Sequence, residues 1–182
     1  MRRFASLSLP IVLVAAAFAR AGDEKKLAYE TPKDWKAIEG KGGMMAPKGQ
    51  WELAKAEGDN EAPTVKLYNF GGQGGTIDDN VKRWASQFKT ADGEKIDPDK
   101  LKRENFAQDG IKVTYVEITG TYSPPAMMGG GDPKKGQKLI GAYVEGEGGP
   151  WFVKLQGPEK SVDKNKDAYI AWLKTWKLEA KK

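Results

Sequence analysis

Two amphipathic patterns, one near the middle of the chain and one near its end, constrain the fold more than any other feature of the sequence. In each, four apolar residues recur at i, i+3, i+4 and i+7, which places them on one face of an α-helix. They are Val81, Trp84, Ala85 and Phe88 in the first pattern and Tyr169, Trp172, Leu173 and Trp176 in the second. A helix with one apolar face must pack on another surface, and the strand-like segments around the two patterns predict that this surface is a β-sheet.

The boundaries of both helices can also be predicted. Asp78 or Asp79 is expected to cap the first helix, and Thr76 with Asp79 has the spacing of a capping box. The second helix is expected from about Asp163 to Lys174 or slightly beyond.

Short apolar segments separated by turn residues predict the strands. These segments are residues 27–30, 35–39, 50–57, 64–70, 111–122, 138–145 and 151–156. The glycine-rich connection at residues 146–150 is short enough for an antiparallel hairpin. We therefore expect an α+β fold, in which a mainly antiparallel sheet of about six strands carries two principal helices on its faces.

Three segments depart from simple alternation. Within residues 111–122 the apolar positions change phase between Val113 and Val116, which predicts a β-bulge or a strand buried on both faces. Residues 91–105 and 123–136 are expected to be loops. Loops of this length are uncommon in compact domains, and they are either mobile surface segments or functional ones.

The N-terminus has the features of a secretory signal peptide. Two arginines precede an apolar stretch, and small residues give two cleavage options, after Ala19 or Ala21. The apolar stretch is shorter than the roughly 20 residues that span a bilayer. We therefore expect a signal peptide over residues 1–21, a single domain over residues 22–182, and a periplasmic or secreted protein with no stable membrane anchor after cleavage.

The positive charge of the chain belongs mostly to this N-terminal segment. The sequence has 30 basic and 25 acidic residues, and cleavage after Ala21 would remove Arg2, Arg3 and Arg20 but no acidic residue. The 27 basic and 25 acidic residues that remain give little attraction toward nucleic acid or anionic lipid. Neither partner is expected, and we expect a monomer.

The sequence contains no cysteine and no histidine. Stability therefore comes from packing and hydrogen bonds without disulfides, even in an oxidising compartment. Histidine is the commonest general base and nitrogen ligand, so its absence together with that of cysteine excludes zinc-finger sites, Ser-His and Cys-His catalysis and thiol chemistry. No cofactor and no metal site are expected.

Three segments carry the framework motifs of a known family. They are residues 29–35 (YETPKDW), 80–88 (NVKRWASQF) and 151–158 (WFVKLQGP), in the order strands, helix, strands and closing helix. In these motifs the chain resembles exported bacterial proteins of the PsbP-like superfamily, which includes the photosystem II extrinsic protein, a nuclear Ran-binding protein and periplasmic lipoproteins. The resemblance implies an α/β/α sandwich used mostly for binding, but framework positions transfer no functional residue. The signal lacks the cysteine of the lipoprotein members.

Three short motifs resemble ligand or catalytic sites only in part. Residues 71–76 are glycine-rich and precede a helix, but no Gly-Lys-Ser/Thr follows and two acids would repel a phosphate. Asp163, Asn165 and Asp167 have calcium-loop spacing, yet the required glycine and final glutamate are absent. Ser86 and Lys89 form an S-x-x-K string without its partner motifs. The first motif is better explained as a strand-to-helix connection, the second as the start of a helix, and the third as coincidence.

Methionine and tryptophan side chains suggest a binding surface. The adjacent pairs Met44-Met45 and Met127-Met128 offer thioethers that can bind Cu(I), although methionine more often fills gaps in cores and binding surfaces. Trp84, Trp172 and Trp176 are expected in the core, whereas Trp35, Trp51 and Trp151 are harder to place. The candidate binding residues are Tyr122, Met127, Met128 and Trp151, and no catalytic residue is assigned.

These observations favour an exported, non-enzymatic binding or accessory domain. One alternative is a hydrolase or lyase that uses only Asp, Glu, Lys, Tyr or Ser. Such an enzyme would show a deep cleft with converging carboxylates or a perturbed lysine. Another alternative is an envelope protein–protein interaction module that docks through residues 123–136.

Overall fold

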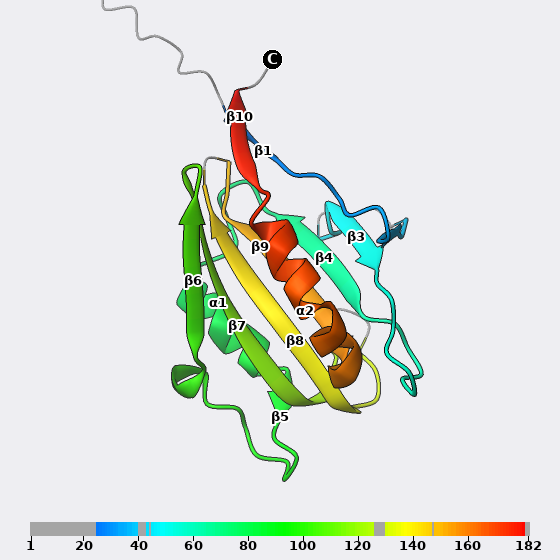
Figure 1. Cartoon of the computed structure of the whole chain (residues 1–182). Helices are drawn as coiled ribbons and strands as arrows, with labels where there is room; N and C mark the ends of the chain where they lie inside the picture. The colour runs from blue at the N-terminus through cyan, green and yellow to red at the C-terminus, as the bar shows by residue number, and fades with distance from the viewer. Residues whose placement is uncertain (1–24, 40–42, 44, 126–129, 147, 181–182) are drawn as a thin grey trace, which may run out of the picture.

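Figure 1 shows the computed structural model of the chain, which describes residues 25–39, 43, 45–125, 130–146 and 148–180. The predicted signal peptide, residues 1–21, lies outside these residues and stays a prediction. The described elements, in chain order, are β1 (Lys25–Ala28), β2 (Lys36–Ala37), β3 (Gly49–Glu52), β4 (Thr64–Asn69), α1 (Ile77–Ala85), β5 (Phe88–Lys89), a 3₁₀ turn (Pro98–Lys100), β6 (Arg103–Gln108), β7 (Ile111–Tyr122), β8 (Lys134–Glu145), β9 (Trp151–Pro158), α2 (Glu159–Leu173) and β10 (Lys177–Ala180).

The strands form one large antiparallel sheet and one small ribbon. The sheet contains eight of the described strands in the order β2-β3-β4-β9-β8-β7, and the outer edge of β7 pairs with both β5 and β6. Strands β1 and β10 pair with each other and carry the two ends of the described chain away from the sheet (Figure 1). The predicted α+β class and antiparallel sheet are confirmed, and the strand number exceeds the predicted six.

The two helices lie on opposite faces of the sheet (Figure 1). Alternation along β7 explains why two cores form. Val113 points toward α2, whereas Val116 and Ile118 point toward α1, so this strand is buried on both faces. The strand also has a register shift between Gly120 and Tyr122. Burial on both faces therefore explains the phase change, because the pairing of β7 with β8 is regular from Lys112 to Gly120 and the register shift lies beyond it.

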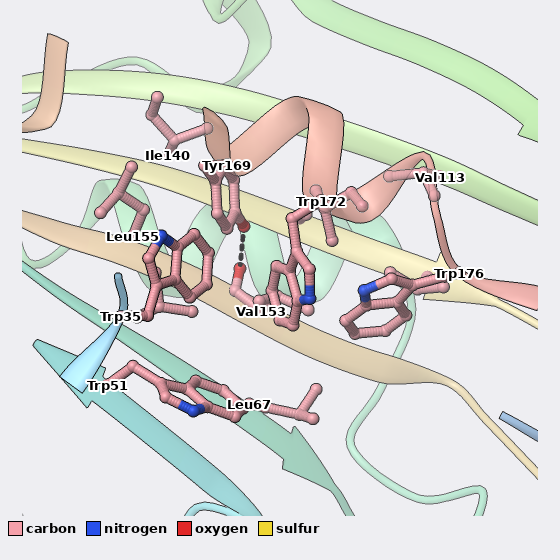
Figure 2. Close-up of a cluster of buried hydrophobic side chains, with 14 of the residues drawn as sticks. Trp35, Trp51, Leu67, Val113, Ile140, Val153, Leu155, Tyr169, Trp172 and Trp176 are labelled. Carbon is pink, nitrogen blue, oxygen red and sulfur yellow. Dashed lines mark hydrogen bonds between the residues drawn. The ribbon is translucent and has the colours of Figure 1, made fainter. Parts of the chain in front are cut away.

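The core beneath α2 is built from aromatic rings (Figure 2). Trp172 lies 4.9 Å from Trp35 and 4.9 Å from Trp176 between ring centroids. The Tyr169 hydroxyl donates a hydrogen bond of 3.1 Å to the carbonyl oxygen of Val153 on β9, which satisfies the polar end of a buried ring. Trp84, Trp172 and Trp176 are buried as predicted, although Trp84 belongs to the core beneath α1 and Trp176 follows the end of α2 at Leu173.

The predicted capping box at the start of helix α1 is confirmed, whereas the prediction of Asp78 or Asp79 as the N-cap is wrong, because both lie within the first turn. Thr76 is its N-cap, and the Thr76 and Asp79 side chains form both halves of a capping box. These hydrogen bonds lower the pKa of the Asp79 carboxyl, with the backbone of Thr76 as the first cause. The helix ends after only nine residues, so at about 1.5 Å per residue it is too short to cover the sheet.

Helix α2 begins at Glu159, earlier than the predicted Asp163. Its N-cap, Pro158, has no side-chain hydrogen bond to offer. Asp59, distant in the sequence, supplies the cap instead, because its carboxylate accepts hydrogen bonds from the backbone N–H (3.0 Å) and the hydroxyl of Ser161. Because the cap comes from a residue distant in the sequence, the residues next to Glu159 contain no N-cap pattern. The predicted start of α2 at Asp163 was wrong for this reason.

Several strand boundaries also differ from the predictions. The expected loop at residues 91–105 ends in the start of β6, whose residues are alternately exposed and partly buried at the edge of the sheet. Strand β8 begins at Lys134 instead of residue 138, and β3 ends at Glu52 instead of residue 57. The lysines and glycine at the start of β8 and the charges of β6 have little β-propensity, so pairing with β7 decides their conformation.

We expect Asp59→Ala to lower the free energy of unfolding by about 1–2 kcal/mol, because it removes the long-range cap of α2. Urea denaturation monitored by tryptophan fluorescence measures this change. Asp92→Ala is the matched control, since Asp92 is exposed in a turn and makes no hydrogen bond or ion pair within the described part of the chain. Equal stability of the two variants would contradict the assigned cap.

Candidate functional site

The candidate site is a groove on the α1 face of the sheet. Helix α1 packs on β5, β7 and β8, and the neighbouring surface of β4 and β9 is left partly uncovered. A hollow of about 500 Å³ lies there. Tyr68, Phe70, Phe152 and Lys154 come from the β4–β9 side of this groove, and Arg83 and Trp84 come from α1.

Aromatic rings line the β4–β9 side of the groove. Tyr68 on β4 is the register partner of Phe152 on β9, so alternation places both rings on the α1 face. Phe70 follows β4 and packs between them, with its ring centroid 6.0 Å from that of Tyr68 and 5.6 Å from that of Phe152. This arrangement gives an apolar ligand a preformed surface.

Polar and apolar residues from two other segments form the rim. Ser86 and Gln87 follow the last turn of α1, and Ser123 and Pro125 follow β7. The Ser123 backbone N–H donates a hydrogen bond of 2.8 Å to the carbonyl oxygen of Gln87, which joins the two segments. Met45 completes the rim and is 62% exposed, the one large apolar side chain so open to solvent among the described residues.

Lys154 is the unusual residue of the groove. It lies in the middle of β9, opposite Lys66 of β4 on one side and Gly141 of β8 on the other. Its side chain is partly buried, and Nζ lies 5.8 Å from the ring centroid of Trp84. Within the described residues, no carboxylate lies within 4.0 Å of Nζ.

The surroundings of Lys154 disfavour its protonated form. Burial, then the positive charges of Arg83 and Lys66, lower the pKa of Lys154 from 10.5 to about 8. Arg83 donates a hydrogen bond to the side-chain oxygen of Asn80, and neither Arg83 nor Lys66 forms an ion pair in the described part of the chain. The groove therefore concentrates positive charge that the described part of the protein does not neutralise.

Trp84 is fixed by a close approach to the sheet. A Cβ atom on Gly141 of β8 would lie 2.6 Å from Cε3 of Trp84, so only glycine leaves room for the indole there. Trp84 is fully buried, and its Nε1 has no hydrogen-bond partner among the described residues. The ring beside Lys154 is thus held in place by packing, and it offers the lysine a π-face at cation–π distance.

The structure separates the residues predicted as a binding surface. Tyr122 ends β7 and pairs with Lys134, whereas Trp151 begins β9 and pairs with Val144, near the other end of β8. Tyr122 packs against the α1 core and Trp151 against the α2 core, so they lie on opposite faces of the sheet. Met127 and Met128 lie outside the described residues. Tyr122 is not among the residues that line the groove, but it directly precedes Ser123, which lies on the rim.

The other motifs of the sequence have structural roles. Asp163 accepts a hydrogen bond of 2.5 Å from Lys138, and Asn165 donates to the carbonyl oxygens of Ala54 (2.8 Å) and Ser161 (2.7 Å). The Ser86 hydroxyl donates to the carbonyl oxygen of Arg83 (2.9 Å) at the end of α1, not to a lysine. Gly71 to Thr76 form the strand-to-helix connection. The backbone N–H of Thr76 donates a hydrogen bond of 3.0 Å to the Asp79 carboxylate, so this N–H is not free to bind an anion.

A second hollow, of about 670 Å³, lies where the 58–61 loop meets the starts of β8 and α2. Some of its charged side chains have partners within the chain. Lys134 pairs with Glu61 at 2.5 Å, and Asp59 caps α2. The groove beside α1 has the stronger claim to a ligand, because it combines cations that have no anion in the described chain with aromatic rings, which the lining of the second hollow lacks.

Sequence reasoning missed Lys154 and Arg83. Lys154 alternates with the apolar residues Val153 and Leu155, a pattern that is usual for a strand with one solvated face. A signal was nevertheless present, because a strand as central and apolar as residues 151–158 is expected to be buried on both faces, and a lysine there needs an explanation.

No protein-family model matches the sequence, and no curated protein matches it. Among solved structures, the chain is similar to cyanobacterial PsbP (CyanoP) from Synechocystis sp. PCC 6803. The TM-score is 0.48 and the sequence identity 12%, over 91% of this chain and 99% of that chain. This neighbour belongs to the superfamily that the sequence resemblance indicated, and the similarity concerns the fold alone. None of the helices in the described residues is long and apolar enough to cross a membrane.

The lowered pKa of Lys154 predicts a pH-dependent effect of Lys154→Met on stability. Between pH 8 and 10.5 the unfolded chain holds more protons at this lysine than the folded chain does, so the stability of the native protein rises with pH. We expect the variant to be more stable by about 1–2 kcal/mol at pH 7, allowing for solvent screening, and this gain to shrink above pH 8. Arg83 from α1 and Lys66 from β4 are the charged groups that face Lys154.

Urea denaturation of both proteins at pH 7 and pH 9.5 measures the effect. Lys36→Met is the control, because Lys36 is exposed on an edge strand and makes no ion pair within the described residues. A gain at Lys154 that does not change with pH would show that the lysine is solvated in the native protein.

Proposed function

We propose that this chain is a non-enzymatic binding domain and that its ligand is an organic anion with an apolar body, held in the groove between α1 and the β4–β9 surface. One observation carries the proposal: Lys154 places a cation without a carboxylate partner against aromatic rings. A buried charge is costly unless it is paired. An anion from outside the chain would supply the missing partner.

The dimensions of the groove favour a small molecule as the occupant. A hollow of about 500 Å³ falls within the ordinary range of small-molecule sites. Tyr68, Phe70 and Phe152 would contact the apolar body, while Lys154 and Arg83 would face the acidic group. A carboxylate bound near two cations gains charge-assisted hydrogen bonds that a neutral ligand of the same shape cannot form.

We also propose that the domain acts outside the cytoplasm, in the periplasm or the surrounding medium, after removal of residues 1–21. The N-terminal pattern of the sequence supports this proposal. The hydrolase or lyase alternative has one of its two expected features, the perturbed lysine Lys154, but it has less support because no carboxylate is among the described residues that line the groove. A reproducible hydrolase activity that Lys154→Met abolishes would overturn the non-enzymatic function.

Calorimetric titration with matched probes tests the ligand class. The anions are 2-naphthoate, indole-3-acetate and decanoate, and the neutral control is 2-naphthamide. We expect one or more of the anions to bind at pH 7 and the amide to bind more weakly. We also expect Lys154→Met to weaken anion binding at least tenfold, because a hydrogen bond to a charged group contributes about 1.5–3 kcal/mol. Lys36→Met should leave affinity unchanged.

Three results would contradict the proposal. The first is the absence of binding for all three anions up to millimolar concentration. The second is equal binding of 2-naphthoate and 2-naphthamide. The third is anion binding that Lys154→Met leaves intact, which would place the anion elsewhere on the protein.

A further inference from the structure

Lys154 combines the features that make a lysine amine a nucleophile. A primary amine reacts through its lone pair, which protonation removes, so an unperturbed lysine is almost inert at neutral pH. Burial and the adjacent cations Arg83 and Lys66 lower the pKa of Lys154 to about 8. Desolvation and a neighbouring cation are the two general means by which proteins activate lysines for reaction with carbonyl compounds.

The ion pairs of the chain show why this lysine differs from others. Lys138 contacts both Glu117 (2.8 Å) and Asp163 (2.5 Å), which hold its amine protonated. Lys166 is held in the same way by Glu117 at 2.6 Å. In contrast, the charged groups that act on Lys154 are the cations Arg83 and Lys66, and its Nζ faces the ring of Trp84.

We propose that Lys154 captures an aldehyde covalently, as an imine, and that the aldehyde carries an apolar body and an acidic group. This inference rests on the proposed function, since it assigns to the organic anion of the groove a carbonyl group that reacts with the ε-amine. The apolar body would contact Phe70 and Phe152, and the acidic group would lie toward Arg83.

The reaction needs no oxidant or reductant. The lone pair of the neutral ε-amine adds to the carbonyl carbon, and a proton moves from nitrogen to oxygen to give a carbinolamine. Loss of one water molecule then forms the carbon–nitrogen double bond, so amine and aldehyde become imine and water. Protonation of the imine gives a cation, which the π-face of Trp84, 5.8 Å from Nζ, can stabilise.

The groove favours capture over turnover. Breaking a bond in an imine-bound ligand needs a group that accepts or donates a proton at the ligand. No carboxylate is among the described residues of the groove, and the sequence has no histidine or cysteine. Burial raises the pKa of Tyr68, so its hydroxyl stays protonated at neutral pH and does not act as a base. We therefore infer reversible capture, in which water releases the same aldehyde that was bound.

Reductive trapping tests this inference. The purified protein is treated at pH 7.5 with substoichiometric 6-formyl-2-naphthoate and cyanoborohydride, and the labelled lysines are located by peptide mass spectrometry. We expect labelling at Lys154 at least tenfold faster than at any exposed lysine, such as Lys36, and slower labelling when 2-naphthoate competes for the groove.

Lys154→Arg separates the two proposals, because arginine keeps the positive charge but cannot form an imine. This variant should still bind 2-naphthoate and should lose the fast labelling, whereas Lys36→Arg, at an exposed position outside the groove, should keep both. Labelling spread evenly over exposed lysines, in a protein that binds 2-naphthoate, would overturn covalent capture and leave anion binding intact. Fast labelling of Lys154 that 2-naphthoate does not slow would instead contradict the anion site.

Discussion

The unequal covering of the two sheet faces is the constraint on which the rest of this structure depends. Strands β4, β9, β8 and β7 occupy the middle of the sheet, so their side chains alternate between two faces that both need cover. On one face, α2 and the rings of Trp35, Trp51, Trp172 and Trp176 complete the cover. On the other, α1 has only nine residues and packs over β7 and β8, and the groove is the part of the face that it leaves.

Positive charge at this uncovered surface gives the groove its chemical character. The alternation that sends Val153 and Leu155 into the α2 core sends Lys154 toward α1, next to a tryptophan that Gly141 allows close to the sheet. A lysine without an acidic partner lowers the stability of the domain at neutral pH. Functional sites often contain residues that lower the stability of the native protein. Lys154 is such a residue, and the same packing that buries it accounts for the proposed anion binding and for the reactivity of its amine.

The sequence patterns predicted correctly those parts of the fold that depend on residues close to one another in the chain. The capping box of Thr76 and Asp79 gave the start of α1, and apolar alternation gave β7 at its observed bounds. Long-range contacts determined what was missed. Asp59 begins α2 early from a distant loop, and pairing with β7 turns the charged residues 103–108 into a strand. The PsbP-like resemblance was carried by framework positions, and it indicated the sandwich without indicating the groove.

The candidate site was hidden for the same reason. Lys154 and Arg83 look like solvent-facing residues of a strand and a helix, and only the packing of α1 against β8 brings them beside the same aromatic rings. Tyr122 and Trp151, which the sequence singled out as candidate binding residues, pack against different cores.

The ionisation of Lys154 is the central claim, and an NMR titration of the protein labelled with ¹³C at lysine Cε measures it directly. The Lys154 signal is assigned by its absence from the spectrum of Lys154→Arg. The account predicts that this signal titrates with a midpoint of about 8, well below the usual lysine value of 10.5. A midpoint near 10.5 would mean that Lys154 is solvated or paired in solution, and would contradict both the anion site and the reactive amine.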